Sequence, residues 1–523
     1  MMFPSMRCRL GTLSTLFLSG LVLSGCPGTG GGSSSTLTQE AYLKAPNAES
    51  NDVFGWVVAA SGNTIVVGAI GESSNQTTIT NGSTASADNS VSGAGAAYVF
   101  VRSGSSWTQE AYLKAPNAGG GDVFGSAVGI SGDTIVVGAS GEDSNQTTIT
   151  NGTTASADNS ANEAGAAYVF VRSGTTWTQQ AYLKAPNAGG GDEFGSAVAI
   201  SGDTIVVGAY IEDSNQTTIT NGTTASADNS APQAGAAYIF VRSGTTWTQE
   251  AYLKAPNAES GDVFGRAVAI SGDTIVVGAL GEDSNQTTIT NGTIASADNS
   301  ANEAGAAYVF VRSGTTWTQQ AYLKAPNVGG GDEFGSAVAI SGDTIVVGAS
   351  GEDSNQTTIT NGTIASADDS ANEAGAAYVF VRSGTTWTQQ AYLKAPNAEN
   401  GDFFGRTVAV SGDTIVIGAS AEDSNQTTIT NGTSASSDNS ASGAGAAYVF
   451  VRSGGTWTQQ AYLKAPNAES GDSFGQPVAV SGGTIVVGAT GEDSNQTAIT
   501  NGTSASSDNS ASGAGAAYVF ILP

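Results

Sequence analysis

Asp122-Val-Phe-Gly-Ser-Ala-Val-Gly-Ile-Ser-Gly-Asp-Thr-Ile-Val-Val-Gly-Ala139 is the stretch that decides the fold of this chain. It contains two β-prone runs, residues 124–130 and 134–139, and the Gly132-Asp133 pair between them is a signal for a tight hairpin turn. The stretch therefore predicts two short antiparallel strands joined by that turn.

The same stretch recurs through the chain at a fixed interval. An Ala-Tyr-Leu-Lys-Ala-Pro-Asn segment accompanies it, with its tyrosine every 70 residues, at Tyr42, Tyr112, Tyr182, Tyr252, Tyr322, Tyr392 and Tyr462. Length alone would suggest about three domains for 523 residues. A constant period without insertions instead predicts a single repeat array.

The second repeat serves as the type for one structural unit. Two further strands are expected at 166–172 and 177–185, and the latter should be an outer strand with Thr178, Gln180 and Lys184 on a wetter face. Four antiparallel strands per unit, repeated seven times, predict an all-β fold, a seven-bladed β-propeller. Residues 140–165 are left over, and the β-prone residues around Asn151-Gly152 suggest a small projecting hairpin in this segment.

The register of the repeats predicts how the ring closes. The last repeat ends just after the third strand, at Pro523, whereas the chain enters the first repeat through 37–45, which matches a fourth strand. We therefore expect the seventh blade to be completed by the N-terminal strand, which removes two exposed sheet edges.

The first residues resemble a bacterial lipoprotein signal. Arg7 and Arg9 precede a short apolar run that ends in Leu23-Ser24-Gly25-Cys26. The interpretation is a signal peptide at 1–25, a lipidated Cys26, a Gly/Ser tether at 26–35 and a propeller at 36–523. The alternative is an ordinary signal peptide with an unmodified cysteine. The lipoprotein interpretation predicts a membrane attachment in the bacterial cell envelope, at the outer membrane or the cell surface.

The motifs of each repeat resemble a known family. Phe124-Gly125, Val137-Gly138-Ala139 and residues 165–170 are similar to the FG-GAP repeat of integrin α-subunit propellers, and most similar to bacterial proteins built from such repeats. The resemblance covers residues 36–523 and implies a propeller whose ligand binds on the face that carries the long loops. Many FG-GAP repeats carry a calcium loop, Asp-x-Asp-x-Asp-Gly-x-x-Asp, between their first two strands. Here that place holds a single carboxylate, Asp133, so the usual calcium motif is absent.

The composition of the chain argues against several classes of function. The formal charge of −28 repels phosphate backbones, so nucleic-acid binding is not expected, and basic partners or metal ions suit the chain better. The absence of histidine excludes His-based catalytic triads and the usual zinc ligands. A Glu142-Asp143 pair recurs in later repeats, which marks it as a repeat feature and not as one catalytic centre. We therefore expect no enzyme activity and no cofactor.

The acidic loops have two interpretations. Glu142, Asp143, Asn145 and Asp158 would offer oxygen ligands to a cation such as calcium, although no recognised ligand spacing is present. The favoured alternative is that they are solvated loop residues and Asx-turns.

Ligand specificity is expected where the repeats differ. The candidate ligand-binding residues are Trp56, Tyr210, Arg266, Phe403 and Arg406, since exposed aromatic and arginine side chains carry much of the energy of binding. Neutral drift among duplicated repeats is the alternative explanation of these differences.

Together these features predict a lipid-anchored, extracytoplasmic binding or adhesion module for a protein or carbohydrate ligand. A multivalent carbohydrate-binding propeller that uses its near-identical loops is the first rival. A glycan-acting enzyme is the second.

Overall fold

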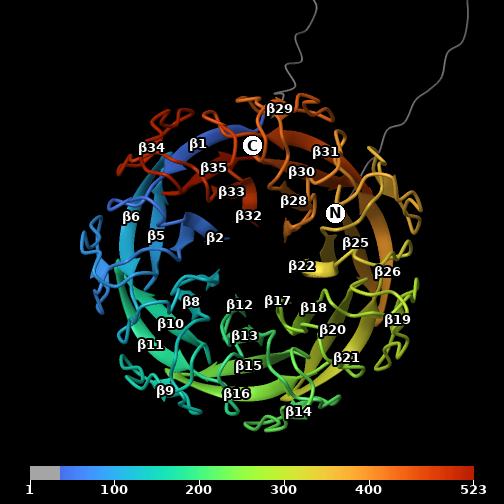
Figure 1. Cartoon of the computed structure of the whole chain (residues 1–523), viewed down its shortest axis with the longest axis horizontal. Helices are drawn as coiled ribbons and strands as arrows, with labels where there is room; N and C mark the ends of the chain where they lie inside the picture. The colour runs from blue at the N-terminus through green and yellow to red at the C-terminus, as the bar shows by residue number, and fades with distance from the viewer. Residues whose placement is uncertain (1–35, 523) are drawn as a thin grey trace, which may run out of the picture. The chain divides into compact units, whose positions relative to one another are not determined.

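The computed structural model describes residues 36–522, which form seven sheets arranged around a central axis (Figure 1). The prediction of an all-β, seven-bladed propeller is confirmed. The predicted signal peptide, Cys26 and nearly all of the tether lie outside the described residues. No helix in the described part of the chain is long and apolar enough to cross a membrane.

Every blade contains the same five strands, numbered here from the axis outward. The first strands are β2 (Phe54–Ser61), β7 (Val128–Ser131), β12 (Ala197–Ser201), β17 (Ala267–Ser271), β22 (Phe334–Ser341), β27 (Thr407–Ser411) and β32 (Phe474–Ser481). The second strands are β3 (Thr64–Ala69), β8 (Thr134–Ala139), β13 (Thr204–Ala209), β18 (Thr274–Ala279), β23 (Thr344–Ala349), β28 (Thr414–Ala419) and β33 (Thr484–Ala489). The third strands are β5 (Ala96–Ser103), β10 (Ala166–Ser173), β15 (Ala236–Ser243), β20 (Ala306–Ser313), β25 (Ala376–Ser383), β30 (Ala446–Ser453) and β35 (Ala516–Ile521). The fourth strands are β6 (Ser106–Leu113), β11 (Thr176–Leu183), β16 (Thr246–Leu253), β21 (Thr316–Leu323), β26 (Thr386–Leu393), β31 (Thr456–Leu463) and β1 (Thr38–Leu43). The two-residue fifth strands are β4 (Thr80–Asn81), β9 (Thr150–Asn151), β14 (Thr220–Asn221), β19 (Thr290–Asn291), β24 (Thr360–Asn361), β29 (Thr430–Asn431) and β34 (Thr500–Asn501). Each of these five lists gives one strand per blade, from blade one to blade seven.

The seventh blade closes as predicted. Strand β1 pairs antiparallel with β35, so the sheet order is β32-β33-β35-β1-β34. In Figure 1 the blue β1 lies beside the red β34 and β35. The N-terminal strand therefore supplies the fourth strand of a sheet whose other strands come from the end of the chain.

The fifth strand corrects the prediction of a projecting hairpin. Thr150 and Asn151 pair with Tyr182 and Ala181 on the outer edge of β11, so this part of the long loop folds back onto its own blade. The Asn151 side chain also accepts a hydrogen bond from the backbone N of Trp247, in the next blade, at 2.7 Å, and it donates one to the carbonyl of Trp247 at 3.1 Å. The fold-back covers an edge that would otherwise be open and fastens each blade to the next.

The innermost strand of blade two is shorter than predicted. It starts at Val128 and not at Phe124. Gly125 has a φ of +95°, and a Cβ at this position would overlap the carbonyl oxygen of Ala96 in the preceding blade. Glycine is therefore required where the chain enters the blade.

The core lies between adjacent blades. Phe124 packs edge-on against Tyr168 and Phe170, with ring centroids 5.3 Å and 6.0 Å apart, and this cluster continues to Val66 and Val99 of the preceding blade. Near the axis the sheets approach so closely that a Cβ at Gly138 would overlap the carbonyl oxygen of Gly195 in the next blade. The glycine of each Val-Gly-Ala segment thus permits the inner strands to meet.

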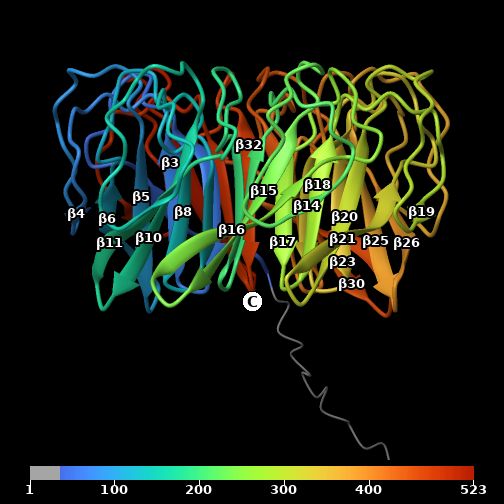
Figure 2. The same cartoon turned by 90° about the horizontal axis from the view of Figure 1, so that it is seen from below.

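The two faces of the propeller differ in their loops. The connections between second and third strands and between fourth and first strands gather at one end, and the tight turns lie at the other (Figure 2). We call these ends the long-loop face and the short-turn face.

Candidate functional site

A cavity of about 660 Å³ lies among the inner strands. All five candidate ligand-binding residues line it, although they come from four different blades and the connections between them: Trp56, Tyr210, Arg266, Phe403 and Arg406. We call this the axial cavity. Trp56 is 37% exposed, whereas the other six tryptophans of the chain are buried.

The repeat register explains why these residues gather. They occupy three positions: just before Phe-Gly, just after it, and just after Val-Gly-Ala. Pairing of Phe54 with Ala69 in blade one places the end of the second strand beside the start of the first, at the long-loop face. Since the first strand is innermost in each blade, each of these positions forms a ring around the axis.

The backbone before each Phe-Gly is unusual. Phe403 and Glu333, which both line the cavity, have φ values of +55° and +56°. This left-handed region is uncommon for residues other than glycine. Hydrogen bonds from the backbone N of Phe403 to the carbonyl of Glu373 and from that of Phe404 to Ala374 hold it in place. The fold therefore fixes the direction of the backbone under these side chains.

Both cavity arginines stack on aromatic rings. The Arg266 guanidinium carbon lies 4.8 Å from the ring centroid of Tyr210, and that of Arg406 lies 5.6 Å from the centroid of Phe403. Burial raises the pKa of Tyr210, and the Glu193 carboxylate beside it adds to the shift. The two guanidinium groups are thus supported on one face by π systems.

Several other residues that line the axial cavity are not among the five candidates predicted from the sequence. Glu333 accepts a hydrogen bond from the Ser350 hydroxyl at 2.7 Å, and in blade six Thr407 donates one to the carbonyl of Gly475 at 2.8 Å. Pro477 and Gln476 line the cavity from blade seven. Glu333 and Gln476 occupy the same ring positions as the selected residues, and Thr407 and Pro477 directly follow one of those positions, so variation between repeats is the signal that could have found them.

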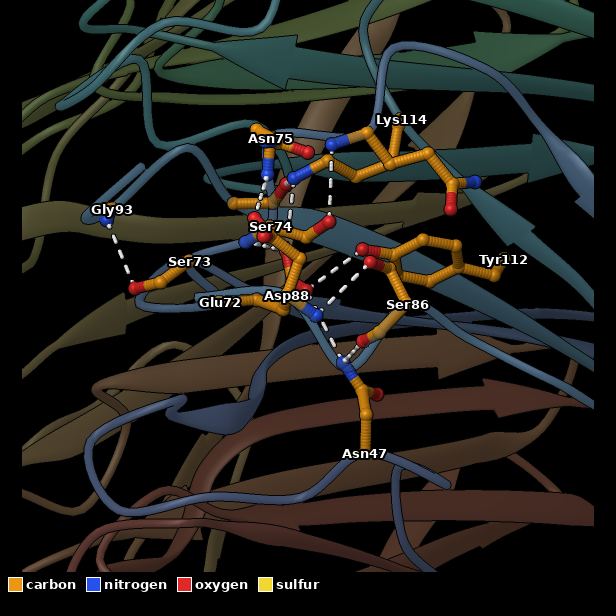
Figure 3. Close-up of polar contacts among 12 residues, drawn as sticks. Asn47, Glu72, Ser73, Ser74, Asn75, Ser86, Asp88, Gly93, Tyr112 and Lys114 are labelled. Atoms are coloured by element: carbon orange, nitrogen blue, oxygen red, sulfur yellow. Dashed lines mark hydrogen bonds and ion pairs between the residues drawn. The ribbon is translucent and has the colours of Figure 1, made fainter. Parts of the chain in front are cut away.

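Glu142 is buried, with 1% of its surface exposed, and it is not a solvated loop residue. Its carboxylate accepts hydrogen bonds from the Tyr182 hydroxyl at 2.8 Å, from Lys184 Nζ at 3.0 Å and from Asn117 Nδ2 at 2.9 Å. Figure 3 shows the equivalent cluster of blade one, with Glu72 beside Tyr112 and Lys114. The expectation that this glutamate is solvated is wrong because the long loop folds back over the end of the outer strand.

Lys184 is buried as well, so the prediction that it lies on a wetter face is also wrong. Its Nζ donates to the carbonyl of Gly165 at 2.6 Å in addition to its ion pair with Glu142. Burial lowers the pKa of Lys184, and the charge of Glu142 opposes that shift. The lysine of every Leu-Lys-Ala segment is therefore a structural cation.

Asp158 confirms the Asx-turn interpretation. It is exposed and accepts hydrogen bonds from the Ser160 hydroxyl at 2.7 Å and from the backbone N of Asn145 at 3.3 Å. These bonds hold the pKa of Asp158 below its usual value. Asp143 likewise accepts the backbone N of Glu163 at 2.9 Å.

The residues that might hold calcium are engaged elsewhere. Asp133, in the turn where the family's metal loop would lie, forms an ion pair with Arg172 at 2.6 Å. Within residues 36–522, no three Asp, Glu, His or Cys side chains gather as they would around a metal ion.

Comparison with known proteins identifies the repeat. The family model described as FG-GAP repeat matches residues 37–100, 107–170, 177–240, 247–310, 317–380, 387–450 and 457–520. No curated protein matches the chain.

Solved structures with similar chain traces are distant. Phage phi92 endosialidase has 11% identity and a TM-score of 0.36, over 93% of this chain and 68% of that one. An acylaminoacyl peptidase in complex with Z-Gly-Gly-Phe-chloromethyl ketone has 9% identity and a TM-score of 0.37, over 87% of this chain and 50% of that one.

Proposed function

Because the chain belongs to the FG-GAP repeat family, we propose that it is a binding module whose ligand enters the axial cavity from the long-loop face. The observation that carries this proposal is the place where the repeats differ. A propeller of identical blades would present the same residue seven times around its axis. Here the ring position after Phe-Gly is occupied by Trp56, Ser126, Ser196, Arg266, Ser336, Arg406 and Gln476.

This divergence creates a site that exists once in the molecule. The outer parts of the blades keep near-identical sequences, whereas three neighbouring positions that line one cavity vary together. Large aromatic and arginine side chains in a concave site are the groups that supply most binding energy in known interfaces. We infer one ligand per propeller at the axis.

We propose binding and not catalysis. The cavity lining contains a single carboxylate, Glu333, which is already hydrogen-bonded to Ser350. Acid–base catalysis by carboxylates uses a pair with separate roles, and the chain has no histidine to replace one of them.

We further propose that Cys26 carries a lipid and holds the propeller at the bacterial cell envelope, where its partner would be a protein or carbohydrate. The support is the sequence Leu23-Ser24-Gly25-Cys26 after an apolar run. Cys26→Ala should abolish incorporation of a labelled fatty acid in the producing bacterium. Equal labelling of the variant and the parent chain would contradict the anchor.

The test of the binding site uses residues that other blades already tolerate. Trp56→Ser, Tyr210→Ser and Phe403→Val introduce the residues found at Ser126, Ser140 and Val53. The parent protein, used as bait on native envelopes, should capture a partner, and the triple variant should lose it while its melting temperature stays close to that of the parent. Capture that is equal in both would place the binding site elsewhere.

One observation favours a second candidate, multivalent carbohydrate binding at the rim. Equivalent cavities of about 310 and 370 Å³ recur between neighbouring blades, one lined by Thr148, Asn151 and Gln249, the other by Thr288, Asn291 and Gln389. The tryptophans that border them are buried, so they offer no exposed ring for a sugar to stack on. Glycan binding with several sites per chain, unchanged in the triple variant, would support this candidate over the axial one.

A further inference from the structure

We propose that the ligand of the axial cavity carries a carboxylate, which Arg266 and Arg406 bind. This inference rests on the proposed function and specifies the chemistry of its site. It depends on a comparison of the ion pairs formed by the arginines and lysines of residues 36–522, in which these two arginines differ from all the others.

Arg266 and Arg406 lack a carboxylate partner. Among residues 36–522, every other arginine and lysine forms an ion pair. The chain has a formal charge of −28, so carboxylates are abundant and most cations are paired with them. That the two exceptions line the same cavity is therefore a specific feature of the site.

The hydrogen-bonding edges of both guanidinium groups are open. Each stacks by its face on an aromatic ring, Arg266 on Tyr210 and Arg406 on Phe403. Stacking orients a guanidinium while leaving its five N–H donors free, and the paired donors match the two oxygens of a carboxylate. Both arginines are exposed to solvent.

The arginines lie on one side of the ring. Arg266 precedes β17 of blade four and Arg406 precedes β27 of blade six, with Glu333 and Ser336 of blade five between them. The Glu333 carboxylate accepts a hydrogen bond from the Ser350 hydroxyl, so the lining itself has two positive charges and one negative charge, and the Glu193 carboxylate lies beside Tyr210 outside that lining. Trp56, from blade one, offers an apolar surface to the remainder of the ligand.

The size and surroundings of the cavity favour a small, singly charged ligand. Its volume of about 660 Å³ is within the range of small-molecule sites. The negative charge of the whole chain repels polyanions such as nucleic acids, and it disfavours doubly charged phosphate esters relative to carboxylates. A free organic acid and the C-terminal carboxylate of a peptide share this chemistry.

Calorimetric titration of the full chain tests the inference with matched probes. Phenylacetate should bind at one site per chain, and the neutral phenylacetamide should bind at least about tenfold more weakly, since it cannot form the charge-assisted pair. Phenyl phosphate should also bind more weakly than phenylacetate. The tripeptide Ala-Ala-Phe, compared with its C-terminal amide, separates the two sources: tighter binding of the peptide acid than of phenylacetate indicates a peptide terminus, and the reverse indicates a small acid.

Arg266→Ser with Arg406→Ser is the decisive variant, because serine occupies this ring position in blades two, three and five. It should weaken phenylacetate binding by about tenfold or more. Arg312→Leu with Arg382→Leu is the control: it removes two charges from the short-turn face, where blade seven has Leu522, and it should leave binding unchanged. Equal binding by the serine variant, equal binding of acid and amide, tighter binding of the phosphate, or no binding of any acid would overturn the proposal.

The envelope experiment separates this inference from the proposed function. Capture that is lost in the aromatic triple variant but kept in the double serine variant would preserve the axial site and reject the carboxylate. Capture that neither variant alters would reject the axial site itself.

Discussion

Lys44 and Glu492, 448 residues apart in the chain, form a buried ion pair with 2.9 Å between Nζ and Oε2. Tyr42 adds a hydrogen bond of 2.7 Å from its hydroxyl to the other carboxylate oxygen. The internal blades contain the same arrangement, for example in Lys184, Tyr182 and Glu142. The blade that joins the two ends of the chain is therefore held by the same chemistry as the internal blades.

Replacement of Lys44 by methionine should be strongly destabilising. It leaves the Glu492 carboxylate buried without its cation, and removal of one partner of a buried pair costs about 3–5 kcal/mol. Lys324→Met, which breaks the equivalent pair with Glu282, is the matched internal control and should cost a similar amount. Chemical denaturation of the variants measures both, and a cost below 1 kcal/mol at Lys44, on the order of a surface pair, would show that the closing pair is not buried in solution.

Deletion of residues 37–45 should lower the melting temperature and promote association. The deletion exposes the edge of β35 and removes the buried side chains of Tyr42 and Leu43, each worth about 1.5–3 kcal/mol. Calorimetry and size-exclusion chromatography read out the two effects.

The same segment placed after Leu522 should restore both properties, because the sheet needs the strand but not its attachment to a particular end. A deletion variant as stable and monomeric as the parent would contradict the importance of the closing strand.

Glu110→Gln should change stability by less than about 1 kcal/mol. Glu110 accepts from Arg172 Nη1 at 3.1 Å and from the indole N–H of Trp177 at 3.4 Å, both in the next blade. At the next junction a glutamine already has this role: Gln180 of blade two accepts the equivalent indole N–H, that of Trp247 in blade three, at 2.9 Å. Glu110→Ala should cost about 1–3 kcal/mol, since it leaves a buried indole N–H without an acceptor. Equal costs for the two variants in denaturation would show that the acceptor atom is unimportant.

Stability should fall as the pH rises from about 5 to 8. Burial raises the pKa of Asp262 and Asp332 from 3.8 to about 7, and that of Asp122 to about 6. The folded state therefore holds protons that the unfolded state has already released, so stability decreases with pH between 3.8 and about 7. Melting temperatures across this range test the sign.

Asp262→Asn with Asp332→Asn provides the control for that pH dependence. Asparagine keeps the acceptor for the backbone N of Glu259 or Gly329 but does not titrate. The variant should show a smaller decrease in melting temperature between pH 5 and 8. An unchanged slope would assign the pH dependence to other groups.

Calcium should add little stability. A ligand that binds only the folded state raises stability in proportion to the logarithm of its concentration over its dissociation constant. Asp133 and its equivalents pair with arginines, and Glu142 is neutralised by Lys184. A large rise in melting temperature with calcium, reversed by a chelator, would contradict this expectation and direct attention to the exposed acids of the long loops.

Most features of the fold that the sequence could predict followed from the register of the repeats. It predicted the blade number and the closing strand, because both follow from where strand-forming segments begin and end. It also selected five of the residues that line the axial cavity, since equivalent positions of a propeller form rings around its axis. Cys26 lies outside the described residues, and its lipidation stays a prediction.

The remainder depends on contacts between blades, which periodicity within one repeat does not reveal. Asn151 looks like a hairpin residue, and its role becomes visible only when Trp247, 96 residues later, is placed beside it. Glu142 and Lys184 look like surface charges, and each is buried because the other neutralises it. A pattern of polar and apolar residues places each charged side chain at the surface, because the pattern does not include the partner that allows the side chain to be buried.

The strand exchange at blade seven has a consequence for assembly. The Asn501 side chain accepts the backbone N of Trp107, and Asn431 accepts that of Leu37, with the geometry found at every internal junction. An unclosed chain thus presents two complementary ends that fit a second copy as well as each other. Closure within one chain is favoured by the high effective concentration of tethered ends. Concentrated refolding shifts this competition toward exchanged dimers and longer chains, so the oligomeric state of the product depends on how dilute the protein was while its ring was open.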